Sequence, residues 1–121
     1  MNPLGHHLLG EFTGCDPARL ASPEVVREAM LAAARASGAT VVAELHHHFS
    51  PLGVSGVVVV SESHLAIHTW PEHGFAAADY FSCSPRVDMA CAMALLAERL
   101  GARAHTTLEL QRGPLQVPPR P

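Results

Sequence analysis

The residues of greatest chemical interest surround the dipeptide Glu62-Ser63, where an apolar run ends. Valines fill residues 57–60, the polar triplet at residues 61–63 follows, and a second stretch rich in reactive side chains comes next. A single straight strand over residues 54–69 would be about 53 Å long at roughly 3.3 Å per residue, which is too long for a domain of this size. The chain must therefore bend near the triplet, and we expect the peptide bond before Ser63 to lie in a turn.

A serine at a strained turn can act on its own backbone. Its hydroxyl attacks the preceding carbonyl carbon and converts the amide to an ester, and β-elimination then leaves a dehydroalanine that hydrolyses to a pyruvoyl group. Strain at such a bond favours the reaction, and the chain would thereby make its own ketone from Ser63. A lone serine in a turn is more often only a turn former, so the dipeptide is weak evidence by itself.

The absence of lysine bears on the same question. All eight basic residues are arginine. A pyridoxal phosphate enzyme anchors its cofactor on a lysine, so we expect no pyridoxal phosphate here. A ketone generated from the chain itself is the other available electron sink for a reaction that needs a Schiff base.

A predicted hairpin places a thiol beside Ser63. Residues 71–74, Pro-Glu-His-Gly, predict a turn between strands at 64–69 and 75–82. Paired positions then sum to about 145 or 146, which puts Cys83 opposite Ser63 within one residue. His68 is five residues from Ser63, roughly 16 Å along a regular strand, so only a bend or a second subunit would bring it near.

The histidines and cysteines do not predict a metal site. His64 and His68 have H-x3-H spacing, but positions i and i+4 lie about 13 Å apart on a strand and cannot share an ion. The triplet at residues 46–48 alternates between the two faces of a strand. The three cysteines show no C-x-x-C spacing. We expect no metal, and we assign structural or solvated roles to the remaining histidines and cysteines with no other proposed role: His6, His7, His105, Cys15 and Cys91.

The hydrophobic pattern predicts an α/β (α+β) fold, a two-layer sandwich in which two helices cover one face of a mostly antiparallel sheet. One helix begins at Ser22-Pro23 and stops at Gly38, and the second runs from about Asp88 to Leu100. The bare sheet face would favour dimerisation. Residues 1–112 are predicted to form one domain and residues 113–121, rich in proline, a disordered tail. The expected strands are 5–12, 39–49, 54–60, 64–69, 75–82 and 103–110.

Composition excludes several classes of partner. The net charge is −3 and the arginines are scattered, so no basic stripe predicts nucleic-acid binding. No apolar run approaches the roughly 20 residues that a membrane span requires. Residues 1–12 lack the basic and apolar regions of a signal peptide, so we expect a cytoplasmic protein.

Several segments resemble the short prokaryotic class of S-adenosylmethionine decarboxylase proenzymes: LGHHLLGEFTGCD, GATVV and GVSGVVVVSESHLAIHTWPEHG, followed by AAADYFSC. The resemblance extends to about Val87; the next helix agrees only in pattern, and the tail after Arg112 is not covered. It implies self-cleavage between Glu62 and Ser63 into fragments 1–62 and 63–121. It also implies a covalently bound pyruvoyl group formed from Ser63, and decarboxylation of S-adenosylmethionine for spermidine synthesis.

The resemblance further implies a role for each of five side chains. His68 would remove the proton that drives elimination during self-cleavage, and Ser55 would hydrogen-bond or protonate the ester. Cys83 would protonate the α-carbon of the substrate after carbon dioxide leaves. Phe49 would stack on the adenine, and Glu72 would bind the ribose hydroxyls. The resemblance also implies a homodimer of two-fragment protomers with shared active sites.

Three positions depart from the family pattern, and two alternatives remain open. His73, Leu52 and Ala66 stand where a tyrosine, an aromatic residue and a hydroxyl residue are usual, and all three concern pocket walls. One alternative is a pyruvoyl-dependent arginine or ornithine decarboxylase on the same scaffold. The other is an unprocessed homologue that binds or regulates a partner.

Overall fold

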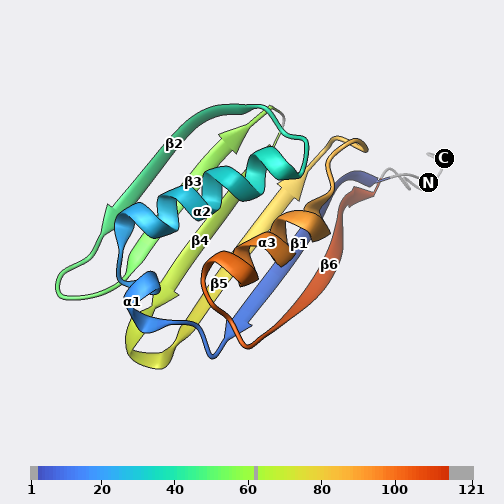
Figure 1. Cartoon of the computed structure of the whole chain (residues 1–121). Coiled ribbons are helices and arrows are strands. Elements are labelled where there is room, and N and C mark those ends of the chain that lie inside the picture. Colours follow the sequence, from blue (N-terminus) through green and yellow to red (C-terminus); the bar gives the residue numbers. More distant parts are fainter. Residues whose placement is uncertain (1–2, 62, 115–121) are drawn as a thin grey trace, which may run out of the picture.

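The computed structural model describes residues 3–61 and 63–114. In this part of the chain the strands form one sheet in the order β2-β3-β4-β5-β1-β6, and every neighbouring pair is antiparallel. The helices cover one face of the sheet (Figure 1). The strands are β1 (Pro3–Thr13), β2 (Val41–His48), β3 (Val54–Val60), β4 (Ser63–Trp70), β5 (Phe75–Ser82) and β6 (Ala104–Pro114). The helices are α1 (Pro17–Leu20), α2 (Pro23–Ala36) and α3 (Met89–Arg99), and Pro71–His73 form a 3-10 turn.

The two-layer sandwich predicted from the sequence is confirmed. Strands β3 and β5 have the predicted bounds, and the other strands differ by a few residues at their ends. Helix α1 was not predicted, because it is a single turn without a repeating apolar pattern. Its start nevertheless has a local signal, since the Asp16 side chain accepts a hydrogen bond from the backbone N–H of Ala18 and Pro17 takes the first helical position.

The predicted start of the tail at Gly113 is wrong. Strand β6 continues through Gly113 to Pro114, because this edge strand stays paired with β1 as far as Pro3. The rest of the predicted tail, residues 115–121, lies outside the described residues.

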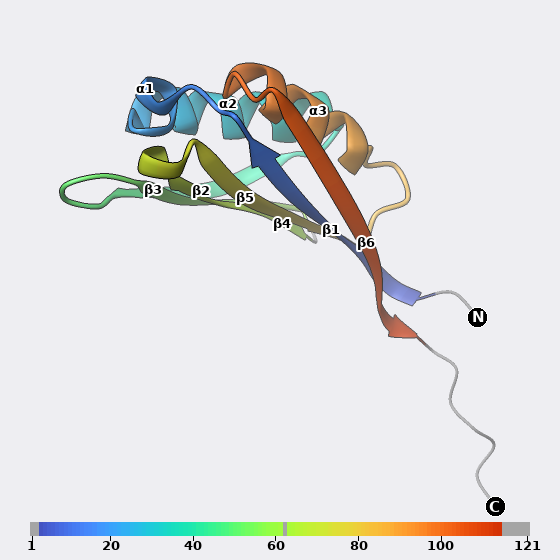
Figure 2. The same ribbon diagram turned by 90° about the horizontal axis from the view of Figure 1, so that it is seen from below.

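The core fills the space between the helices and the sheet. Helix α2 begins at Ser22, whose hydroxyl accepts a hydrogen bond from the N–H of Val25, and α3 begins at Asp88, whose carboxylate accepts one from Cys91. Both helices turn an apolar stripe to the sheet. In edge-on view all three helices lie on the same side, while β1 and β6 run on beyond them toward the chain ends (Figure 2). Buried members of the core include Val26, Met30, Ala33, Met93, Leu96, Leu8, Phe12, Leu65, Ile67 and Tyr80.

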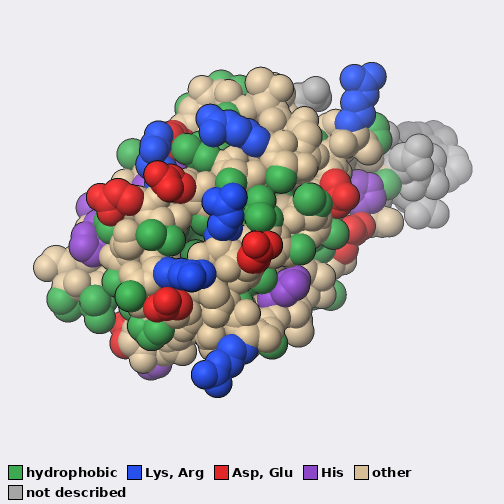
Figure 3. Space-filling model, in the orientation of Figure 1, with side chains coloured by type: hydrophobic (Ala, Val, Ile, Leu, Met, Phe, Trp, Pro, Cys, Tyr) green, Lys and Arg blue, Asp and Glu red, His purple; other side chains and the backbone are tan. Residues whose placement is uncertain are grey.

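The two faces of the molecule differ in character. On the helical face, basic and acidic side chains are interspersed (Figure 3), in keeping with the predicted absence of a basic stripe. The opposite face of the sheet, here called the open face, carries exposed apolar side chains. Leu45 on β2 is 69% exposed and Leu108 on β6 is 61% exposed. These two leucines lie on the two edge strands of the sheet.

Edge strand β2 is fastened by a histidine that packs on a glycine. The His46 imidazole lies over Gly56 of β3, its partner in the register, and a Cβ at Gly56 would overlap the ring. The His46 side chain is only 5% exposed, and burial lowers its pKa. Its Nδ1 lies 3.2 Å from Glu44 Oε1, and the guanidinium of Arg27 on α2 binds the same carboxylate with Nη2 at 2.8 Å. The glycine thus makes room for the imidazole beside Glu44, the side chain that links β2 to α2 through Arg27.

We expect Gly56→Ala to lower the free energy of unfolding by about 1–3 kcal/mol, since the new methyl group must displace the imidazole. Chemical denaturation of the single and double variants measures this. In the matched double variant with His46→Ala, the same substitution should cost much less, because the ring is gone. An equal cost in both backgrounds would contradict the packing described here.

Candidate active site

Two of the predicted processing residues are neighbours across β3 and β4. Ser55 pairs with His68 in the register, and both side chains point to the open face. The Ser55 hydroxyl oxygen lies 2.7 Å from His68 Nδ1. A hydrogen bond at this position orients the imidazole and leaves Nε2 free to take or give a proton.

Phe49, Glu72, Ser55 and His68 line one cavity of about 300 Å³. The family resemblance implied a role for all four. The structure adds Trp70, an exposed aromatic side chain in the same wall, which sequence reasoning missed. Aromatic faces beside a carboxylate and a hydroxyl suit a ligand that has both a flat ring and several hydroxyl groups.

A buried threonine holds this end of the sheet together. Thr69 Oγ1 accepts a hydrogen bond from the N–H of Val54 at 2.9 Å and donates one to the carbonyl of Leu20 at 2.9 Å. The loop before β3 is closed by the N–H of Phe49, which donates to the carbonyl of Gly53 at 2.8 Å. Gly53 has a φ of 101°, which a residue with a Cβ rarely adopts. These bonds set the position of Phe49 against β4.

Ser63 and Cys83 lie together at the other end of β4 and β5. Ser63 pairs with Ser82, so paired positions sum to 145 as the hairpin predicted, and Cys83 follows directly as an exposed residue. Strand β3 ends at Val60 and β4 begins at Ser63, which confirms the predicted break, although Glu62 itself lies outside the described residues. The Ser63 hydroxyl is buried and has no hydrogen-bond partner among the described residues. A buried hydroxyl without a partner costs about 1–3 kcal/mol.

Within one chain these two groups of residues are separate. The connection before Ser63 and the loops that carry Phe49 and Glu72 lie at opposite ends of the sheet (Figure 1). Strand β4 is regular from Ser63 to Trp70, so no bend shortens the distance of roughly 16 Å between Ser63 and His68. The sequence left two ways to bring His68 near Ser63, a bend in the strand or a second subunit, and the regular strand excludes the bend.

A polar cluster on the open face was missed from the sequence. His7 Nε2 lies 2.9 Å from Asp79 Oδ1, and His64 Nε2 lies 3.3 Å from the same oxygen. The Arg112 guanidinium lies 2.8 Å from His7 Nδ1. His7 was assigned a structural role and His64 was considered only with His68. The four side chains come from β4, β5, β1 and β6, which are neighbours in this order, so only the strand order of the sheet could have revealed the cluster.

The cluster is the arrangement of described residues best suited to a metal ion, since its three ligand atoms lie within 4.8 Å of one another. Its hydrogen bonds oppose this use. A guanidinium can only donate, so His7 Nδ1 accepts and the proton is on Nε2, directed to Asp79. A histidine that binds a metal normally donates its other ring N–H to an acceptor. The pattern is that of a closed hydrogen-bond network.

None of the described helices is long and apolar enough to cross a membrane.

Comparison with known proteins identifies relatives that are S-adenosylmethionine decarboxylases. A model of the S-adenosylmethionine decarboxylase family matches residues 6–113. The S-adenosylmethionine decarboxylase proenzyme of Acidithiobacillus ferrooxidans is 46% identical over 97% of this chain and 88% of its own length. The proenzyme of Acetivibrio thermocellus is 48% identical over 98% of this chain and 95% of its own length.

The fold agrees as well. The crystal structure of adenosylmethionine decarboxylase from Aquifex aeolicus superimposes with a TM-score of 0.87 at 29% identity, and the match covers 100% of both chains. The chain therefore belongs to the S-adenosylmethionine decarboxylase family and is the proenzyme of a pyruvoyl-dependent decarboxylase.

Proposed function

We propose that the chain cleaves itself between Glu62 and Ser63, and that Ser63 supplies the pyruvoyl group with which the protein decarboxylates S-adenosylmethionine. The buried Ser63 hydroxyl at the start of β4, which has no hydrogen-bond partner among the described residues, is the observation that carries this proposal. A buried hydroxyl that no described group binds is available to attack the adjacent carbonyl carbon. Once formed, the pyruvoyl group would accept the electron pair released with carbon dioxide.

The side chains around the two ends of the sheet have complementary roles in this proposal. His68, oriented by Ser55 at 2.7 Å, removes the proton that drives elimination, and Ser55 protonates or hydrogen-bonds the ester. Cys83 delivers a proton to the α-carbon of the substrate, so it acts as a thiol. Phe49 and Glu72 bind the adenine and the ribose.

We also propose that the active site is shared between two copies of the chain. Ser63 and Cys83 lie at one end of the sheet, and Phe49, His68 and Glu72 lie at the other. A two-fold interface between open faces sets each end of one sheet against the opposite end of its copy. The exposed leucines of the open face are the apolar surface that such an interface would bury.

The proposal includes no metal ion, because the network around Asp79 is closed by Arg112. It places the protein in the cytoplasm, as expected from the sequence. The cavity favours a nucleoside over the rival substrates arginine and ornithine, since its lining includes two aromatic side chains, Phe49 and Trp70, and an aromatic ring suits a purine. The other alternative, a homologue that binds or regulates a partner, would not be cleaved, so a test of cleavage distinguishes it from the proposed enzyme.

We expect the purified protein to consist of two fragments, residues 1–62 and 63–121. The Ser63→Ala variant should remain a single chain of 12.8 kDa. The physical reason is that alanine has no hydroxyl to attack the carbonyl. Intact-mass spectrometry measures both. Ser61→Ala is the matched control and should still be cleaved. A wild-type protein that stays uncleaved after prolonged incubation refutes self-processing.

Cys83→Ala should leave cleavage intact and lower the release of carbon dioxide from S-adenosylmethionine by about 10²–10⁴-fold, the usual contribution of a general acid. The assay uses carboxyl-labelled S-adenosylmethionine, with labelled arginine and ornithine in parallel. Cys91→Ala removes the other exposed thiol and should behave as wild type. If the wild-type protein decarboxylates only arginine or ornithine, the proposed substrate S-adenosylmethionine is wrong and the rival substrate is correct.

A mixed dimer tests the shared site. In a dimer of one Cys83→Ala chain and one Glu72→Ala chain, a shared arrangement leaves one site with both residues intact, so about half of the wild-type activity should return. Co-expression with two different affinity tags isolates the mixed dimer, and each variant alone is the control. If each site belongs to one chain, the mixed dimer stays as inactive as the single variants.

A further inference from the structure

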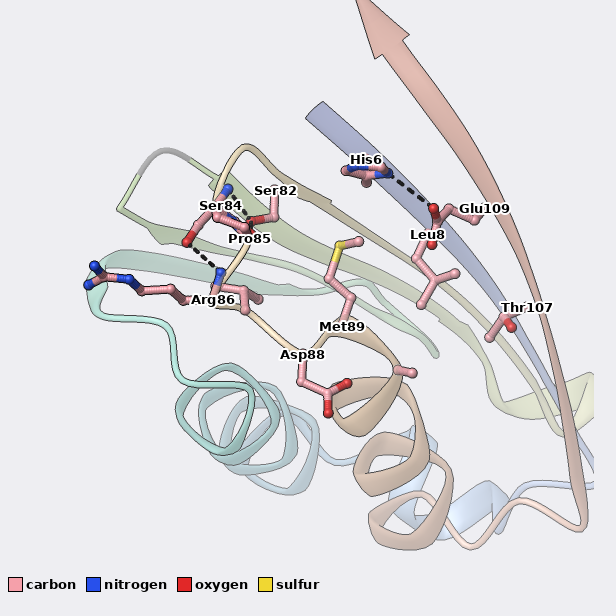
Figure 4. Close-up of a pocket in the computed structure, with 12 residues that line it drawn as sticks. His6, Leu8, Ser82, Ser84, Pro85, Arg86, Asp88, Met89, Thr107 and Glu109 are labelled. Carbon is pink, nitrogen blue, oxygen red and sulfur yellow. Dashed lines mark hydrogen bonds and ion pairs between the residues drawn. The ribbon is translucent and has the colours of Figure 1, made fainter. Parts of the chain in front are cut away.

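Ser82, the last residue of β5, binds the turn that contains Cys83. The backbone N–H of Ser84 donates to the Ser82 hydroxyl oxygen at 3.0 Å, and that hydroxyl lies 3.4 Å from the Ser84 carbonyl oxygen. The N–H of Arg86 in turn donates to the Ser84 hydroxyl at 3.2 Å. Figure 4 shows the two serines and Arg86 joined in this way. Such side-chain-to-backbone bonds fix short turns.

Ser82 lies on the helical side of the sheet and is only 2% exposed. With Ser84, Met89 and Glu109 it lines a cavity of about 820 Å³ between β1, β6 and the start of α3 (Figure 4). Cys83 follows Ser82 just beyond the end of β5 and is exposed. Ser82 is the register partner of Ser63, so these two side chains share one side of the sheet, and its bond to the Ser84 N–H links Ser82 to the turn that carries Cys83.

The turn starts at the position that pairs with Ser63. Ser82 is opposite Ser63 on β4 and opposite His6 on β1, so the sheet holds it from both sides. Cys83 is one residue further along. The distance between the Cys83 thiol and the ketone derived from Ser63 therefore depends on the backbone conformation of residues 82–84. The hydrogen bond between the Ser82 hydroxyl and the Ser84 N–H fixes that conformation. Proton transfer is sensitive to displacements of about 1 Å, which can cost roughly 10²-fold in rate.

We propose that Ser82 is a positioning residue of the decarboxylation: by accepting the hydrogen bond from the Ser84 N–H, it holds the Cys83 thiol at the Ser63-derived ketone. This inference rests on the role proposed for Cys83. The alternative is a serine that only stabilises the turn. That role would change the melting temperature of the protein but neither its turnover number nor the reactivity of Cys83.

The first test compares Ser82→Ala with Ser82→Thr, which keeps the hydroxyl. Ser82→Ala should self-cleave, retain KM within twofold and lose about tenfold in kcat, because the hydroxyl binds the turn of Cys83 and is not one of the proposed substrate-binding groups. Ser82→Thr should restore kcat to within about twofold of wild type. If Ser82→Ala keeps the wild-type kcat, or if it fails to self-cleave, the inference is overturned.

The second test measures Cys83 without turnover. Iodoacetamide alkylation of the processed protein, followed by peptide mass spectrometry, gives separate rates for Cys83 and for Cys91, which is the internal reference on α3. We expect the ratio of the two rates to rise at least about threefold in Ser82→Ala, where the released turn makes the thiol more accessible, and to stay unchanged in Ser82→Thr. An unchanged ratio in Ser82→Ala overturns the inference.

Cys83→Ala separates the two levels of the proposal. Full turnover in Cys83→Ala would overturn the role of Cys83 and the inference about Ser82 together. Impaired turnover in Cys83→Ala with normal turnover in Ser82→Ala would overturn the inference about Ser82 alone.

Discussion

The register of β4 against its two neighbours is the constraint on which the rest of the structure depends. Ser55 meets His68 on one side of the strand, and Ser63 meets Ser82 on the other. Because side chains alternate along a strand, a slip of one residue would turn the apolar partners of the helices to the open face and bury the polar ones. The core therefore enforces the same register that places the reactive side chains.

Much of this register could be predicted from local sequence, and the rest could not. Proline and glycine around Glu72 mark the hairpin, so the position of Cys83 relative to Ser63 followed from counting. The family resemblance gave Ser55 and His68 their roles, and their pairing came from the structure. The cluster of His7, His64 and Asp79 needed the non-local pairing of β1 with β5, which no local pattern specifies. The length of β6 was underestimated because its partner β1 keeps it paired past Gly113.

The sheet divides its two faces between stability and chemistry. The helical face supplies the packed core, and the links from Thr69 to Leu20 and from Arg27 to Glu44 fasten the sheet to its helices. The open face carries the Ser55–His68 pair among exposed apolar residues, whereas the Ser63 side chain shares the helical side with its register partner Ser82. A rigid core on one face lets the other face remain incomplete until a second copy covers it, which is what the proposed shared site requires.

The turn after Ser82, which contains Cys83, also lies beside Ser63. Ser82 is the hydroxyl residue opposite Ser63, and its hydroxyl is bonded to the backbone of Ser84, while the Ser63 hydroxyl has no hydrogen-bond partner among the described residues. The cost of that unsatisfied group, about 1–3 kcal/mol, is small against the roughly 5–15 kcal/mol by which a domain is stable. A donor to the Ser63 oxygen would lower the energy of the proenzyme and make that oxygen a poorer nucleophile. In the proposed reaction the Ser63 oxygen, which has no such donor among the described residues, stays available for the attack.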